Sequence, residues 1–486
     1  MNYTHRYLAR IIIEAQTPLA IGSGERDVMT DRLVTTDVNG LPYIPGTALT
    51  GILRQSLSES GTSVPDELFG YQKGDNGQGS RLILSSAQII GKEGDVADGL
   101  LNINFADDFY LNFRNLPVRQ HVRITHKGAA ETRGKFDEQV VFKGARFCFE
   151  LEFIGDEKDA PVWNRIISEF NNPAFRIGGG TRKGFGEISV IETKSVCIDL
   201  IADLQMYLSK SSGLNDSFWD SIEPNEKQQF KQEDWIAYEL KLTAEDFFLF
   251  GSGFASENGD ADMTFVNEKT IVWNEGKPKF TEEQVLIPAT SVKGALAHRV
   301  AFHYNKLCGI TAEKLKESSS INDLLKNGFY DFRNKPNDKF NSANYNDRMK
   351  LVTTYNPAVR NLFGFTVDEQ KENGAQRGNA IFSDVFLLSA PKKKLLNHVA
   401  IDRFTGGAMD GALFSEEVAS SKEEFSLKIM VNNKAFENGN YKKAFEAALK
   451  DLCNGMLPLG GGTMRGNGCF TGVLTKNQEE IYNGKQ

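Results

Sequence analysis

GGGTRKGFG, at residues 178–186, and GGGTMRGNG, at residues 460–468, are two copies of one pattern in this 486-residue sequence. Each has three glycines, a threonine, two residues that include a cation, and two further glycines, and a β-rich run follows. Glycine has no Cβ, so another backbone can approach such a loop closely, and the loop's own N–H groups can form a concave anion site. With Arg182, Lys183 and Arg465 inside these loops, the sequence predicts that they bind a phosphate.

Neither glycine loop fits the better-known phosphate-binding motifs. A Walker loop needs Gly-Lys followed by Ser or Thr, whereas Lys183 is followed by Gly184. The dinucleotide fingerprint fails on its spacing and on its strand–turn–helix context. A tight turn between two strands is the alternative for either loop taken alone, but two copies in one chain indicate a duplicated unit.

The rest of the sequence repeats in the same order. Strand-like runs at residues 7–15 and 235–242 each lead to Gly-Ser-Gly, an acidic loop, an Ile-Pro step and an amphipathic helix pattern. Strands interleaved with a few helices, without regular βα alternation, predict an α+β fold with antiparallel sheets. We expect three segments: a first module at residues 1–208, a linker at 209–234, and a second module at 235–486 with a larger insertion near 301–360.

A helix is predicted after the Ile-Pro step of each copy, at residues 44–45 and 287–288. Thr47 and Thr290 are placed to cap these helices, because a threonine oxygen accepts a hydrogen bond from a free N–H of the first turn. A helix N-terminus rich in hydroxyl groups also favours a bound phosphate.

Composition narrows the class of protein. Hydrophobic residues make up 40% and charged residues 25% of the chain, as in ordinary globular proteins. No apolar run reaches membrane-spanning length and no signal peptide is recognisable, so we expect no membrane partner. Five scattered cysteines without a CxxC pair favour the cytoplasm and argue against a zinc site. Because the net charge is −8, any RNA-binding surface must be local.

A longer series of motifs links these observations to a known family. It comprises Gly-Ser-Gly, the acidic loop, PYIPGTALTG at 42–51, His-Val at 121–122 and 398–399, IDRFTGGA at 401–408 with EEV at 416–418, and the glycine loops. This order resembles the RAMP superfamily of CRISPR-associated proteins, in particular the "Cas seven" backbone subunits of type III effector complexes. The resemblance covers nearly the whole chain, twice, and is similar to the tandem fusions that some type III-D systems carry.

The resemblance implies a fold, partners and a set of RNA-binding residues. Each module would be ferredoxin-like (RRM-type), with helical insertions and an inserted β-hairpin thumb, at about residues 125–140 and 404–418, that displaces a base pair between guide and target. The partners would be a CRISPR guide RNA, a single-stranded target RNA and other CRISPR-associated effector subunits. The RNA-binding residues would be Thr47, Thr50, Arg54, Thr290, Ser291, Lys293, Gly178, Gly179, Gly180, Arg182, Lys183, Gly460, Gly461, Gly462, Arg465 and Arg403.

A basic band supports RNA binding from the residues themselves. Residues 119–146 carry seven Lys or Arg against three acids, which suits a phosphate backbone. Within the band we expect Arg123, Lys127 and Arg133 to contact RNA. The alternative is a solvated basic strand pair.

In active members of the family, an Asp of the acidic loop drives divalent-ion-dependent cleavage of target RNA opposite each displaced base. Such an Asp can accept the proton of the attacking 2′-hydroxyl or hold the ion. In copy one, Asp31 begins a run similar to the family's Asp-x-x-Val-x-x-Asp, and Asp27 is the second choice. In copy two, counting from Gly-Ser-Gly selects Asp260, and counting from the downstream pattern selects Asp262. The cofactor would be Mg²⁺ or Mn²⁺, with Asp31, Asp260 and Asp262 as possible ligands.

The sequence leaves two other functions open. One is an architectural subunit that binds guide and target RNA but cuts nothing. The other is a guide-processing ribonuclease that depends on a histidine. His121 and His398 occupy equivalent places, but no second catalytic partner is recognisable beside both, so we expect both to be structural.

Overall fold

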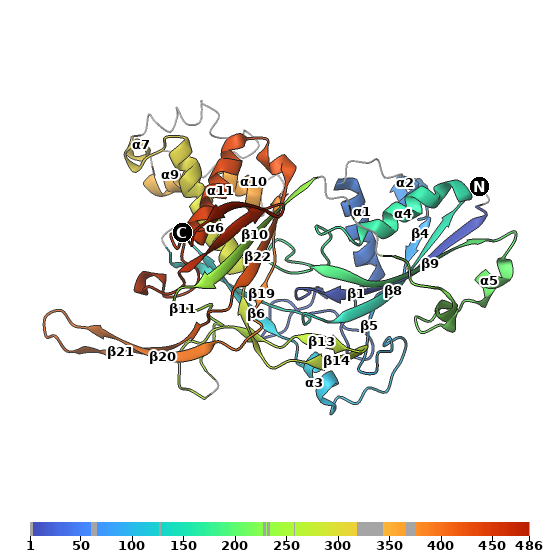
Figure 1. Cartoon of the computed structure of the whole chain (residues 1–486), viewed down its shortest axis with the longest axis horizontal. Helices are drawn as coiled ribbons and strands as arrows, with labels where there is room; N and C mark the ends of the chain where they lie inside the picture. Colours follow the sequence, from blue (N-terminus) through green and yellow to red (C-terminus); the bar gives the residue numbers. More distant parts are fainter. Residues whose placement is uncertain are drawn as a thin grey trace.

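The computed structural model describes residues 3–59, 66–125, 128–226, 230, 234–256, 258–317, 344–365 and 375–485. A five-stranded antiparallel sheet forms the centre of each half of the chain (Figure 1). The first sheet has the order β4 (Leu82–Leu84), β8 (Arg146–Gly155), β1 (His5–Ala15) and β9 (Ile188–Asp199), with β5 (Gln88–Ile89) also paired to β8. The second has the order β18 (Ala380–Phe382), β22 (Phe425–Asn432), β10 (Trp235–Ala244), β23 (Phe470–Lys476) and β24 (Glu479–Asn483).

The chain follows the same path through both sheets. A helix follows the first strand of each sheet, α1 (Gly46–Glu59) or α6 (Ala289–Leu307), and another precedes β9 or β23, α4 (Ala160–Glu169) or α11 (Gly439–Cys453). When β5 and β24 are left out and the other strands are numbered along the chain, both sheets have the order 2-3-1-4. The predicted α+β class with antiparallel sheets is confirmed, and the βαββαβ path is compatible with a ferredoxin-like fold.

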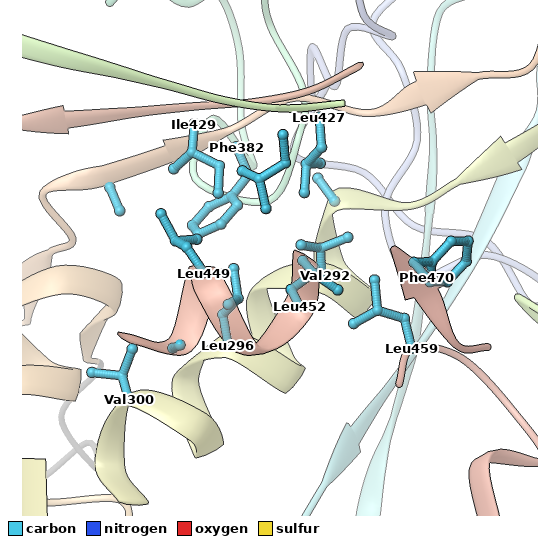
Figure 2. Packing of buried hydrophobic residues seen from close by; sticks show 14 of the residues in the cluster. Val292, Leu296, Val300, Phe382, Leu427, Ile429, Leu449, Leu452, Leu459 and Phe470 are labelled. Carbon is cyan, nitrogen blue, oxygen red and sulfur yellow. The ribbon is translucent and has the colours of Figure 1, made fainter. Parts of the chain in front are cut away.

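Each sheet buries one face against its two helices. The alternating residues Tyr7, Ala9, Ile11 and Ile13 of β1 are buried, as a strand with one covered face requires. Leu49, Leu53 and Leu57 recur every four residues along α1 and form its buried stripe. Figure 2 shows the same packing in the second half, where α6, α11 and β22 contribute Val292, Leu296, Val300, Leu449, Leu452, Leu427 and Ile429.

Two β-hairpins stand where the thumbs were expected, and both are longer than predicted. The first pairs β6 (Val118–Ile124) with β7 (Ala130–Gln139), and the second pairs β20 (Lys392–Ile401) with β21 (Ala408–Ser420). The second hairpin extends away from the second five-stranded sheet into solvent (Figure 1). Phe404, at the turn of this hairpin, is fully exposed. The base of the first hairpin instead contacts the second half, where a Cβ on Gly253 would lie 3.2 Å from the Gln120 side chain.

The two halves pack directly on each other. The hairpin of β13 (Ile271–Asn274) and β14 (Lys277–Phe280) belongs to the second half but lies against α3 (Asp108–Arg114) of the first (Figure 1). Trp273 Nε1 donates a 2.7 Å hydrogen bond to the Gly144 carbonyl, and the rings of Phe280 and Phe109 lie 5.5 Å apart.

Much of the segment expected to be a linker folds onto the first sheet. It begins at the last residue of α5 (Leu204–Ser209) and contains the short helix η2 (Ser217–Ser221). Trp219 is buried with Leu8 and Ile198 on the sheet face opposite the helices, and its indole N–H bonds the Glu150 carboxylate. The Asn225 N–H donates to the Thr193 carbonyl at 2.7 Å, so the segment stays attached to β9 as far as residue 225.

The insertion expected near 301–360 is partly regular structure. Its first residues continue α6 to Leu307, and it includes α7 (Ala312–Lys316), α9 (Tyr345–Val352) and part of α10 (Pro357–Phe363). Residues 318–343 lie outside the described residues. No described helix is both long and apolar enough to cross a membrane.

Candidate RNA-binding and cleavage sites

Asp31 lies at the base of the first hairpin. Its N–H donates a 2.7 Å hydrogen bond to the Asp137 carboxylate, and its own Oδ2 accepts one of 3.2 Å from the Asp137 N–H. This reciprocal pair fixes the Asp31 carboxylate against β7 while the residue stays exposed. A fixed, solvent-facing carboxylate is able to accept a proton or hold a cation.

Asp262 makes the same reciprocal pair in the second half. Its N–H donates to the backbone oxygen of Ser415 at 3.0 Å, and its Oδ2 accepts a 2.8 Å hydrogen bond from the Ser415 N–H. Phe265, three residues after Asp262, forms a β-bridge with Gly251. Val34, three residues after Asp31, forms the equivalent β-bridge with Gly22. Asp262 is therefore the structural counterpart of Asp31.

The other two acidic candidates occupy different positions. Asp260 lies exposed before the shared pattern begins and is not the counterpart of Asp31. Asp27 holds a turn together, since its Oδ1 accepts the N–H groups of Met29 at 2.7 Å and Thr30 at 2.6 Å. The Asp27 side chain therefore stabilises the turn in which it lies, which gives it a structural role.

The glycine loops do admit a close backbone, but that backbone belongs to the protein. Gly178 has φ = 85°, and a Cβ there would lie 2.6 Å from the Ala20 carbonyl oxygen. Gly460 has φ = 87°, and its Cβ would collide with the Leu249 carbonyl. The middle N–H groups bond these carbonyls, Gly179 to Ala20 and Gly461 to Leu249. These two N–H groups are therefore not available to an anion.

Gly180 and Gly462 also require glycine, at φ = 64° and φ = 68°. Beyond them, the loop cations face a buried carboxylate in each half. Lys183 Nζ lies 3.5 Å from Glu138, and Arg465 Nη2 lies 2.6 Å from Glu416.

Each hairpin histidine has an acidic neighbour that was not predicted from the sequence. His121 Nε2 lies 2.9 Å from Glu138, and His398 Nε2 lies 3.0 Å from Glu416. Burial opposes ionisation of Glu138, but His121 and Lys183 outweigh it and hold the Glu138 pKa below its usual value. A His-Val pair followed by a Glu two residues before a Val, in both copies, was the signal available in the sequence.

Cations from both halves gather where the first glycine loop meets α6. A Cβ on Gly184 would lie 2.6 Å from the Ala289 side chain in the first turn of α6. Burial, and then repulsion by Arg377, lowers the pKa of Arg182 to about 9. Burial lowers the pKa of Lys293 to about 8, and repulsion by Lys183 and Arg182 adds to the effect. Like charges in a partly dry junction are unfavourable until an anion joins them, so this junction suits a phosphate.

Neither Thr47 nor Thr290 caps its helix, because acceptors from other segments do so. The Gly46 N–H donates to Ser86 Oγ at 3.2 Å, and the Ala289 N–H donates to Asp384 Oδ1 at 2.8 Å. Thr47 is exposed in the first turn of α1, and Thr290 and Ser291 are half-buried in the first turn of α6.

The remaining helix candidates lie further along α1. The Thr50 hydroxyl donates to the Gly46 carbonyl at 2.8 Å, so it is already engaged within the helix. Arg54 is half exposed, 4.0 Å from Asp66.

The basic band of residues 119–146 does not form one surface. Arg119 is buried and paired with Glu268 and Asp384 of the second half, and Arg146 pairs with Glu14. Arg123 and Arg133 remain exposed on the first hairpin, and Arg403 is exposed near the turn of the second. Lys127 lies outside the described residues.

The acidic loops offer hard oxygen ligands in small numbers. In the first half Asp31 and Asp137 place two carboxylates together, and in the second half Asp262 adjoins the Ser415 hydroxyl at 3.1 Å. Within the described ranges, no three His, Cys, Asp or Glu side chains gather closely enough to form a metal site. A divalent ion would therefore need oxygens from its substrate as well, as Mg²⁺ commonly does.

Comparison with known proteins agrees with the repeated geometry. A family model described as RAMP superfamily matches residues 12–189 and 241–471, one region in each half. No curated protein matches the chain. The family match supports a CRISPR-associated, RNA-binding subunit as the broad assignment.

Proposed function

The chain belongs to the RAMP superfamily, and we propose that it is a backbone subunit of a type III CRISPR effector complex, built from two ferredoxin-like modules in tandem. It binds guide RNA, presents a single-stranded target RNA to its two acidic loops, and cuts that target at Asp31 and Asp262. Its partners are these two RNAs and the other effector subunits.

The observation that carries the proposal is the cation junction of Arg182, Lys183 and Lys293. It brings a glycine loop of one half to the first turn of a helix in the other. Lys183 already lies 3.5 Å from Glu138, whereas burial and neighbouring cations lower the pKa values of Arg182 and Lys293, so an anion at this junction would be stabilising. A guide-RNA phosphate supplies that negative charge, and the release of its counterions into solvent favours binding.

Cleavage is assigned to the acidic loops because the same held carboxylate occurs twice. The 2′-hydroxyl of the target attacks the adjacent phosphate when the two are in line, and Asp31 or Asp262 accepts its proton. As the new P–O bond forms, the P–O5′ bond breaks, which leaves a 2′,3′-cyclic phosphate and a 5′-oxygen that takes a proton from water. The backbone pairs with Asp137 and Ser415 hold each carboxylate at one place beside a hairpin. A divalent ion held by Asp31 or Asp262 and the target phosphate would supply stabilisation of the developing charge.

Two measurements on the assembled complex test the proposal. RNA extracted from the purified complex is expected to have a discrete length. An end-labelled complementary target is expected to be cut at two positions, and a chelator is expected to prevent both cuts. Asp31→Ala should erase one cut and leave the other, with target binding unchanged, because phosphate contacts lie elsewhere.

The outcomes separate the rival functions. A complex without RNA contradicts guide binding. A complex that binds target but leaves it intact is an architectural subunit. Cleavage of repeat RNA by the chain alone, without metal, would identify a guide-processing enzyme instead.

A further inference from the structure

A buried carboxylate occupies the same place in each half. The side chain of Glu138 is 2% exposed and that of Glu416 is 4% exposed. Each contacts the last cation of its glycine loop and the histidine of its hairpin. His121 stacks on Phe136 and His398 on Phe414, with ring centroids 4.9 and 4.8 Å apart.

These two glutamates also stand beside the acidic loops. Gln139, the residue after Glu138, donates its N–H to the carbonyl of Arg32 at 2.9 Å, and Arg32 directly follows Asp31. Glu417, the residue after Glu416, donates its N–H to the carbonyl of Met263, also at 2.9 Å, and Met263 directly follows Asp262. Each buried carboxylate therefore joins the hairpin to the glycine loop, one residue before the backbone bond that attaches the acidic loop to the hairpin.

Stability alone does not account for this arrangement. A buried ion pair is often no more stabilising than apolar residues of the same volume, because both charges lose their hydration. The surroundings differ between the halves, since Met263 and Ser415 stand where Arg32 and Asp137 stand in the first. The His–Glu–cation group is nevertheless present in both. The feature common to both halves is a neighbouring aspartate, Asp31 or Asp262, whose carboxylate is fixed by a backbone N–H of the hairpin.

We propose that Glu138 and Glu416 are positioning residues for target cleavage. By tying the glycine-loop cation and the hairpin histidine together, each keeps its acidic loop in register with the RNA on the glycine loop. Glu138 acts through Asp31, and Glu416 acts through Asp262. This role rests on the proposed cleavage function, and it predicts local effects, one half at a time.

The test uses Glu138→Gln and Glu416→Gln in the assembled complex, with single-turnover cleavage of a saturating end-labelled target. Glu416→Gln should slow the Asp262-dependent cut by about 10- to 100-fold, because small misplacements cost that much in rate. The other cut and the dissociation constant for target should not change. Arg465→Lys, which keeps the charge, should retain most of the rate, and Arg465→Met should not.

Glu446→Gln is the matched control. Glu446 is also a partly buried carboxylate of the second half with a cation partner, 3.3 Å from Lys476, but it lies on α11. The Glu446→Gln variant should make both cuts at the wild-type rate. Equal slowing of both cuts by Glu416→Gln, or an unchanged rate, would overturn the proposal.

A second readout is independent of cleavage. Amide hydrogen exchange should become faster in residues 262–268 and 459–468 of the Glu416→Gln complex, and stay unchanged in residues 25–37. Unchanged exchange around Asp262 would overturn the positioning role even if the wild-type complex cuts no RNA. Should Glu416→Gln fail to fold, Arg465→Met gives the same comparison from the exposed side of the pair.

Discussion

Arg119 and Asp384 form a buried ion pair across the two halves of the chain, with Nη1 2.5 Å from Oδ2. Arg119 also holds both oxygens of Glu268. Asp384 in turn accepts the first N–H of α6, so the base of the first hairpin is connected to the helix that carries Lys293. One arginine thus links the two halves at their predicted RNA-binding elements.

Removing Arg119 should destabilise the protein strongly. Arg119→Met leaves Glu268 and Asp384 buried without their cation, which costs about 3–5 kcal/mol. Urea unfolding of the purified chain measures the loss. Arg123→Met is the control, because its 3.3 Å pair with Glu131 is exposed and contributes at most about 1 kcal/mol. Equal effects of the two variants would contradict the importance of the buried pair.

The glycine loops should discriminate between adjacent positions. Gly460→Ala places a Cβ at φ = 87° against the Leu249 carbonyl and should lower the free energy of unfolding by about 1–3 kcal/mol. Gly461→Ala meets Leu249 atoms only at 3.5 Å and should change stability by less than about 1 kcal/mol. RNA content should survive Gly461→Ala. Loss of RNA from that variant would show that the RNA backbone itself approaches Gly461.

Lys293 should make RNA binding depend on pH. Its folded pKa of about 8 lies below the ordinary lysine value, so the RNA-free protein gains stability as pH rises from about 8 towards the ordinary value near 10.5. A bound phosphate favours the protonated amine of Lys293, so the affinity for guide RNA should fall as the pH rises through this range. RNA retention at pH 7 and pH 9 measures this. Lys293→Met should bind more weakly at pH 7 and lose much of the pH dependence.

Asp262 and Asp260 should behave differently. Asp262→Ala should slow the second cut by at least about 100-fold, the usual contribution of a general base. Asp260→Ala should leave the second cut intact, because Asp260 lies outside the pair with Ser415. A time course on end-labelled target distinguishes them. If Asp260→Ala removed the cut instead, the structural equivalence of Asp31 and Asp262 would not extend to chemistry.

The order of motifs was enough to predict the α+β fold and the repeat, because hydrophobic alternation and turn residues are local signals. Counting residues could not choose between Asp260 and Asp262, since the loop before them differs in length between the copies. The bridges of Val34 and Phe265 settle which positions correspond, through contacts that no count along the chain contains.

Other features depended on partners far away in sequence. Arg119 belonged to a predicted RNA-binding band, yet its partner Glu268 lies 149 residues further on. Thr47 and Thr290 fitted a capping pattern, but Ser86 and Asp384 supply the acceptors through tertiary contacts. Glu138 counted only as one of the three acids within the basic band, whereas in the folded chain it lies beside His121 and Lys183. Residue type and spacing identify local roles, and long-range pairing then reassigns them.

The folded-back segment that ends at Asn225 leaves only a short connection to β10, which begins at Trp235. A short tether keeps two binding partners at an effective concentration of millimolar or more. The halves therefore meet in a fixed ratio and order however little of the protein a cell makes. Dilution, which would dissociate two separate subunits, cannot change the spacing between Asp31 and Asp262.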